Sequence, residues 1–109
     1  METLLPLQPR DYLILFALAG GPLHGHGILK AVEEESGGVT LDPANLYRSL
    51  KRLERDTLIA RSGGQGGGRR QNFELTDVGG EALKAEAQRL VLLADAARAR
   101  SLVDPKVPA

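Results

Sequence analysis

Basic residues crowd into one stretch of an otherwise neutral chain. All 109 residues together carry 14 basic and 14 acidic side chains, so the net charge is zero. Between positions 48 and 70, however, seven basic residues face only two acidic ones, Glu54 and Asp56. The basic residues are Arg48, Lys51, Arg52, Arg55, Arg61, Arg69 and Arg70. Because charge separated in this way creates a local positive field, the stretch predicts a phosphate-bearing partner, that is, nucleic acid.

The residue types within this stretch suggest how such a partner is read. Arg48 can make two hydrogen bonds to a guanine edge and Asn45 two to an adenine edge, and Ser49 stands beside them. We expect Lys51, Arg52 and Arg55 to contact phosphates, which position a protein without reading sequence. Tyr47 lies on the border of this group, so a DNA contact and a place at the edge of the core both stay open.

Other chemistries find less support. His24 and His26 are two residues apart, whereas metal ligands on a helix need a spacing of three or four, and the chain has no cysteine. The glycine-rich run at 63–68 lacks the Gly-Lys-Ser/Thr of a phosphate-binding loop. The serines have no nucleophile motif such as Gly-x-Ser-x-Gly. We therefore expect no metal, no cofactor and no catalytic residue.

A helix beginning after Asp42 would present the basic side chains together. Asp42 is a good N-cap and Pro43 suits the first helical position. Leu46, Leu50 and Leu53 recur at steps of four and three, which places them on one face. The opposite face carries Ala44, Arg48, Lys51, Arg52 and Arg55.

A hairpin is expected directly downstream. Positions 58–61 and 69–75 have the character of short strands, and the glycine-rich run at 63–68 joins them. Arg69 and Arg70 flank this run and could reach the minor groove, which attracts arginine when it is narrow. The sequence thus predicts a basic wing beside a basic helix.

Three further helices complete the expected arrangement. We place them at 8–19, at 24–36 and from 77 to about 103, the last capped by Thr76. In the last helix, small and apolar residues repeat at the 3.5-residue spacing of a seam that packs on a partner helix. The expected dimerisation residues are Leu83, Ala87, Leu90, Val91, Leu93, Ala94 and Ala97.

The order of elements predicts a mainly α fold with a small β-hairpin, namely a winged helix-turn-helix followed by a C-terminal dimerisation helix. The expected division is a DNA-binding domain at 1–76, the dimerisation helix at 77–103 and a frayed tail at 104–109. Positions 1–7 have no basic segment typical of a secretory signal, and no run approaches the ~20 apolar residues that span a bilayer. We therefore expect a cytoplasmic protein.

Several short motifs resemble the PadR family of transcriptional regulators. They are Tyr12-x-Ile14-Leu15, Gly21-Pro22-Leu23-His24-Gly25, Leu46-Tyr47-Arg48-x-Leu50-x-Arg52-Leu53-Glu54, Leu58-Ile59 and Leu75-Thr76-x-x-Gly79. The chain resembles the short subfamily, which has a single C-terminal helix. This resemblance implies a homodimeric repressor that binds a partly palindromic operator and releases it when a small-molecule effector binds.

The chain departs from the family pattern at three positions. His26 stands where a tyrosine is usual, Thr57 where a glycine commonly precedes Leu-Ile, and Phe73 where a tyrosine is frequent. None of these changes removes a basic residue. Tryptophan is absent, so the paired tryptophans that stack flat drugs in some relatives are missing here.

The resulting hypothesis is a sequence-specific DNA-binding regulator and not an enzyme. Its expected partners are double-stranded operator DNA, a second copy of the chain and, by resemblance, a small-molecule effector. The alternative is a winged-helix adaptor that binds another protein and no DNA. The two differ in a simple observable, since binding through several phosphates weakens steeply as salt rises.

Overall fold

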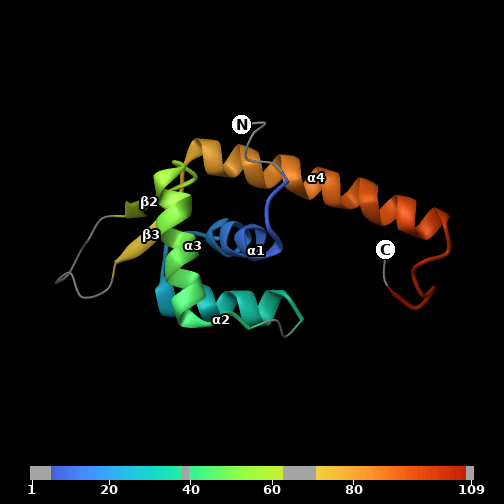
Figure 1. The fold of residues 1–109 in the computed structure, drawn as a ribbon, viewed down its shortest axis with the longest axis horizontal. Helices are drawn as coiled ribbons and strands as arrows, with labels where there is room; N and C mark the ends of the chain where they lie inside the picture. The colour runs from blue at the N-terminus through green and yellow to red at the C-terminus, as the bar shows by residue number, and fades with distance from the viewer. Residues whose placement is uncertain (1–5, 38–39, 63–70, 108–109) are drawn as a thin grey trace.

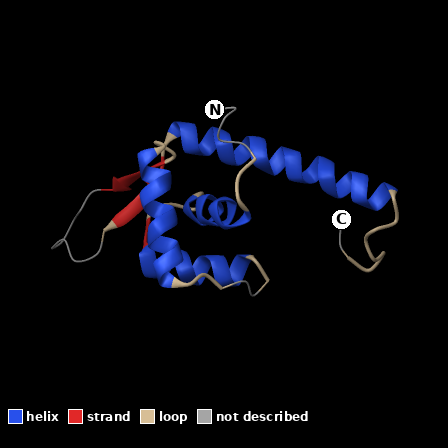
Figure 2. Cartoon of the chain, in the orientation of Figure 1, coloured by secondary structure: helices blue, strands red, loops and turns tan. Residues whose placement is uncertain are grey.

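The protein is mainly helical with one small antiparallel sheet, as the sequence predicted (Figure 2). This computed structural model describes residues 6–37, 40–62 and 71–107. In chain order the elements are α1 (Pro9–Leu18), β1 (Leu23–His24), α2 (Gly25–Glu35), α3 (Pro43–Arg55), β2 (Ile59–Ser62), β3 (Asn72–Leu75) and α4 (Asp77–Ala99).

The starts of three helices follow from the local sequence. Pro9 lies in the first turn of α1, where its missing N–H leaves no hydrogen bond unmade. The Asp42 carboxylate accepts the backbone N–H of Asn45 at 3.2 Å and so caps α3. The Thr76 hydroxyl accepts the N–H of Gly79 at 3.0 Å and caps α4. All three starts were predicted.

The end of α4 was placed too late by the sequence. The helix stops at Ala99 rather than near Val103, because Ser101 adopts a left-handed φ of 58°. The N–H of Leu102 then turns back to the carbonyl of Ala97 at 2.9 Å, which satisfies one of the last free carbonyls.

The sheet has a third strand that the sequence analysis missed. Its order is β1-β3-β2, with Leu23 opposite Phe73 and Arg61 opposite Phe73 on the other side. His24, expected as the first residue of the second helix, ends β1 instead. It also caps α2, since its Nδ1 accepts the N–H of Gly27 at 3.1 Å.

One aliphatic core joins all four helices to the sheet. Its side chains, all buried, are Leu7, Ile14, Leu15, Leu18, Ile28, Val32, Leu46, Leu50, Leu53, Leu58, Ile59, Phe73 and Ala82. Ala82 comes from α4, whose first half packs on α1. The expected division at residue 76 therefore does not coincide with the edge of the core.

The second half of α4 extends away from this core (Figure 1). The chain measures 52 × 29 × 22 Å along its principal axes. The sheet lies at one end of the long axis and the C-terminal half of α4 at the other, with α3 exposed on the near side of the view (Figure 1). Within the parts of the chain described above, no helix is long and apolar enough to cross a membrane.

Candidate nucleic-acid interface

Helix α3 separates an apolar face from a basic one. Its buried residues, Leu46, Ser49, Leu50 and Leu53, pack into the core. Arg48, Lys51 and Arg55 are exposed on the opposite side. At ~100° per residue these three fall within a narrow sector, which is the geometry of a helix that presents one basic face to a partner.

Two of the residues expected to read bases contact each other. Asn45 Oδ1 accepts a hydrogen bond from Arg48 Nη2 across one turn of α3. Arg48 is exposed and Asn45 half-buried, so the amide holds the guanidinium near the N-terminal end of the helix. A guanidinium has five N–H donors, so donors remain for an external partner. We therefore assign Asn45 the role of orienting Arg48.

The expected DNA contact of Ser49 is wrong. Its side chain is completely buried, and its hydroxyl has no hydrogen-bond partner among the described residues. The spacing could have revealed this, because Ser49 lies three residues after Leu46 and four before Leu53. Both intervals keep it on the leucine face of the helix.

The expected phosphate contact of Arg52 also needs correction. Arg52 Nη2 lies 2.6 Å from each carboxylate oxygen of Asp11, a buried residue of α1. The guanidinium is thus held by an internal charge that would otherwise be buried without a partner. We assign Arg52 a structural role that fixes α3 on α1. The partner was hidden from the sequence because it lies 41 residues away.

The two acidic residues of the basic stretch are engaged at its margins. Glu54 Oε2 accepts from Arg61 Nε at 3.0 Å, and Asp56 Oδ1 accepts from Arg55 Nε at 3.3 Å. The Arg55 side chain is 71% exposed, so its pair is a weak surface interaction. Within the described residues, Arg48 and Lys51 form no ion pair. The centre of the α3 face therefore carries uncompensated positive charge.

Tyr47 is exposed, so of the two positions that the sequence left open, a place at the edge of the core is excluded. It retains 57% of its accessible surface. Its hydroxyl lies over Gly25 at the start of α2, where a Cβ atom would stand only 2.6 Å from that oxygen. The Gly of the His24-Gly25 motif thus makes room for the tyrosine ring.

The hairpin is present, and its described part carries one basic residue. Arg61 of β2 stacks over the ring of Phe73, with 5.7 Å between Cζ and the ring centroid. Arg69, Arg70 and the glycine-rich run at 63–68 were expected to form the tip of the wing, and they lie outside the described residues.

The seam expected on α4 is divided between the core and the surface. Leu83 was assigned to dimerisation, but it packs against the chain's own core, which corrects that expectation. Farther along, four successive apolar side chains are exposed: Leu90 at 37%, Val91 at 59%, Leu92 at 69% and Leu93 at 52%. Leu92 is the most exposed of them and was missed, because the seam pattern skipped it. Ala87, Ala94 and Ala97 are half-buried.

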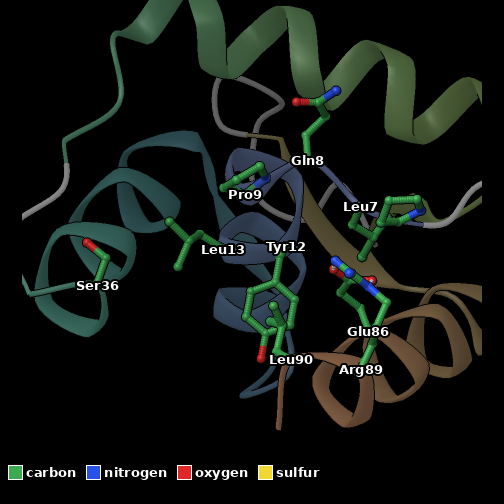
Figure 3. Close-up of a pocket in the computed structure, with 10 residues that line it drawn as sticks. Leu7, Gln8, Pro9, Tyr12, Leu13, Ser36, Glu86, Arg89 and Leu90 are labelled. Carbon is green, nitrogen blue, oxygen red and sulfur yellow. Dashed lines mark hydrogen bonds and ion pairs between the residues drawn. The ribbon is translucent and has the colours of Figure 1, made fainter. Parts of the chain in front are cut away.

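A hollow of about 490 Å³ lies between α1, the end of α2 and α4 (Figure 3). Tyr12 and Leu13 of α1 and Leu90 of α4 supply apolar walls, and Ser36 lies on the opposite side of the view from Arg89 (Figure 3). The remaining lining residues are Pro6, Leu7, Gln8, Pro9, Glu86 and Arg89.

One ion pair borders this hollow. The buried Glu86 accepts two hydrogen bonds from Arg89, one of them from Nε at 2.9 Å. The guanidinium holds the pKa of Glu86 below its ordinary value, and the backbone N–H of Leu7 acts in the same direction against the effect of burial. A paired carboxylate and guanidinium therefore stand at the edge of a mainly apolar space.

No group of three or more metal-ligating side chains comes together in the described segments. His24 and His26 stack with 6.3 Å between ring centroids, and His24 uses Nδ1 to cap α2. The geometry thus concentrates on one exposed basic helix beside a hairpin, the arrangement of a winged helix-turn-helix transcription regulator.

Comparison with known proteins identifies the family. Residues 14–85 match the family described as "Transcriptional regulator PadR-like family", and the chain belongs to that family. The family is one of transcriptional regulators. A curated relative is an "Uncharacterized 37.1 kDa protein in transposon TN4556" of Streptomyces fradiae, 43% identical over 81 residues. The match covers 74% of this chain and only 23% of that protein, so the chain spans about a quarter of its relative's length.

Two solved structures are similar in fold and sequence. A PadR family transcription regulator from Clostridium difficile R20291 is 30% identical, with a TM-score of 0.70 over 81% of this chain and 93% of the other. Bacillus subtilis PadR in complex with operator DNA is 28% identical, with a TM-score of 0.64 over 73% of this chain and 47% of the other.

Proposed function

We propose that this protein is a homodimeric transcriptional repressor that binds a palindromic DNA operator. The observation that carries the proposal is the exposed face of α3, where Arg48 and Lys51 have no acidic partner within the described residues. The DNA complex of the similar Bacillus subtilis PadR supports it. A helix-turn-helix inserts its second helix into the major groove, and α3 holds that place in this fold.

Three of the four basic side chains of α3 contact DNA in the proposal. Arg48, oriented by Asn45, reads a base edge near the N-terminal end of the helix. Lys51 and Arg55 hold phosphates on the same exposed face. Arg52 is left out, because Asp11 engages its guanidinium.

The second half of α4 supports a dimer. Residues 90–93 are all apolar, and at ~100° per residue they cover the full circumference of the helix. A helix that is apolar all round is normally buried, but one copy of the chain leaves all four side chains at least 37% exposed. A second copy packed on this segment would cover them. Ala94 and Ala97, one and two turns along, would let the two backbones approach.

The dimer is tested by placing a charge on that segment. Leu92→Glu should convert the dimer to monomers in sedimentation equilibrium, because an unpaired carboxylate would be buried in the interface. Lys84→Glu places a carboxylate at an exposed position two turns before Leu92, outside the apolar segment, and should leave the dimer intact. A Leu92→Glu protein that stays dimeric at micromolar concentration contradicts this interface.

The hollow between α1 and α4 supports an effector. It lies where the DNA-binding core meets the helix that would join the two copies, so a ligand there would bear on the distance between the two α3 helices (Figure 3). Its apolar walls and the Arg89–Glu86 pair at its edge suit a small, mainly apolar molecule with a polar group. Binding of such a molecule would weaken the hold on the operator.

The DNA-binding function is tested by selecting bound duplexes from a random pool. A homodimeric reader should enrich an inverted repeat with half-sites about 10 base pairs apart, or a multiple of that distance. A protein-binding adaptor would enrich no sequence at any salt concentration, and that outcome would refute the proposal.

A further inference from the structure

A second hollow, unconnected with the one between α1 and α4, opens beside the basic helix. It measures about 310 Å³ and lies where the start of α2 meets α3 and the sheet. Its lining comes from β1, α2, α3, β2 and β3 with the residue before β3, namely His24, Gly25, His26, Tyr47, Arg61, Gln71 and Phe73. None of these residues is acidic.

Hydrogen-bond donors of several kinds converge on this hollow. Tyr47 contributes a hydroxyl that lies over Gly25, and His26 an exposed imidazole. Arg61 gives its Nε to Glu54, which leaves the other N–H groups of its guanidinium. Phe73 forms an apolar wall beneath Arg61. A hollow lined by donors and without a carboxylate suits an anion.

The position of the hollow points to the source of that anion. Tyr47 is the neighbour of Arg48 on α3 and lies ~100° around the helix from it, on the side that faces the sheet. If Arg48 enters the major groove, the backbone bordering that groove passes along this flank. The hollow would then lie against a phosphodiester.

We propose that this hollow binds one phosphate of the DNA backbone, with His26, Tyr47 and Arg61 as its donors. The inference rests on the proposed DNA-binding function and adds to it a site on the flank of α3. It also assigns a function to His26, which stands where the family usually has a tyrosine.

The three donors differ in charge. The Arg61 guanidinium is cationic, whereas Tyr47 offers a neutral hydroxyl. Loss of Arg61 should therefore reduce the salt dependence of operator binding, and loss of the Tyr47 hydroxyl should weaken binding without changing that dependence.

The test measures operator affinity against salt concentration for the full chain. In Arg61→Gln the slope of log K against log salt should shrink by about 1.8, because the dimer loses one charged phosphate contact in each half-site. His26→Ala and Tyr47→Phe, which each remove a hydrogen-bond donor, should weaken binding roughly three- to tenfold.

Two controls make the result decisive. Lys84→Gln removes one exposed charge from α4 and should leave the affinity and the salt slope unchanged. The imidazole NMR signals of His26, assigned by comparison with His26→Ala, should shift when the selected duplex is added. They should not shift with inorganic phosphate at the same ionic strength.

Each remaining outcome overturns a definite statement. If the wild type binds no duplex, the proposed function itself fails. If the wild type binds and Arg48→Ala does not, while His26→Ala, Tyr47→Phe and Arg61→Gln keep the wild-type affinity and salt slope, only the phosphate site is refuted. A saturable shift of His26 with inorganic phosphate alone would show a site for a free anion instead.

Discussion

At Gly79 the first turn of α4 passes so close to the chain before β2 that no side chain fits. A Cβ atom built there would lie 1.9 Å from the carbonyl oxygen of Leu58, a backbone atom that cannot rotate away. The same carbonyl accepts the N–H of Thr76 at 3.2 Å. The Gly of the Leu75-Thr76-x-x-Gly79 motif therefore allows α4 to dock on the sheet.

We expect Gly79→Ala to destabilise the protein by about 2 kcal/mol or more, because the clash can be relieved only by moving α4. Gly80→Ala is the matched control. It sits in the same helix with open space around it and should be neutral or stabilising by up to about 1 kcal/mol. Urea unfolding at a fixed protein concentration measures both. Equal effects of the two substitutions would contradict the close approach.

The backbone of Thr57 is strained. This strain explains why the family commonly has a glycine at that position. Its φ is 64°, in the left-handed region that disfavours a β-branched residue. The conformation is imposed from both sides. Its N–H donates to Glu54 at the end of α3, and its carbonyl accepts the hydroxyl of Thr76 at 2.6 Å.

We expect Thr57→Gly to stabilise the protein by about 0.5–1 kcal/mol. The free energy gained by relieving the backbone strain exceeds the free-energy cost of the conformational entropy that glycine adds to the unfolded chain. Thr57→Ala keeps a Cβ atom and should recover much less. The midpoint of urea unfolding distinguishes the two variants, and a Thr57→Gly protein less stable than the wild type would rule out the strain.

At the scale of elements, α3 has one arginine that is paired inside the protein and another that is exposed to solvent. Arg52 and Arg55 both lie on the side away from the leucines, yet the Asp11 carboxylate holds the first while the second is 71% exposed. Two arginines of one basic helix therefore have different roles, and only the tertiary structure distinguishes these roles.

This difference predicts opposite effects of the same substitution. Arg52→Met leaves the buried Asp11 unpaired and should lower the free energy of unfolding by about 1–3 kcal/mol. Arg55→Met breaks a surface pair and should change stability by less than about 0.5 kcal/mol. It should reduce the salt slope of operator binding by about 1.8, because the dimer loses one phosphate contact in each half-site. Chemical unfolding and DNA titration of both variants test this. The division of roles fails if Arg52→Met leaves stability unchanged.

For the whole molecule, the sequence predicted most of what is local. Asp42, Pro9 and Thr76 begin helices through contacts within three or four residues, and such signals can be read from the chain. The order of helices, the hairpin and the fold class followed from periodicity. The basic character of α3 was also evident.

The sequence could not show what depends on distant partners. A strand of two residues, β1, has no periodicity to detect, and it forms only because β3 lies beside it. The pairing of Arg52 with Asp11 and the packing of Leu83 into the core depend on how α1 meets α3 and α4. Ser49 is different, since its spacing from the leucines already indicated burial.

The two proposed interaction surfaces lie apart in the molecule. α3 lies beside the sheet, and the second half of α4 extends toward the other end of the long axis (Figure 1). In a dimer joined through α4, the rigid packing of its first half on α1 would fix the separation of the two α3 helices. The spacing of the operator half-sites would then be a property of α4.

The central claim is that the exposed face of α3 binds DNA through Arg48. It is tested most directly by the affinity of the selected duplex for the wild type and for Arg48→Ala, measured by fluorescence anisotropy over a range of salt concentrations. We expect Arg48→Ala to bind at least about 100-fold more weakly, as befits loss of a good base contact in each half of a palindrome, with unchanged helicity and oligomeric state. An Arg48→Ala protein that binds the duplex as tightly as the wild type, with the same salt slope, would contradict the account.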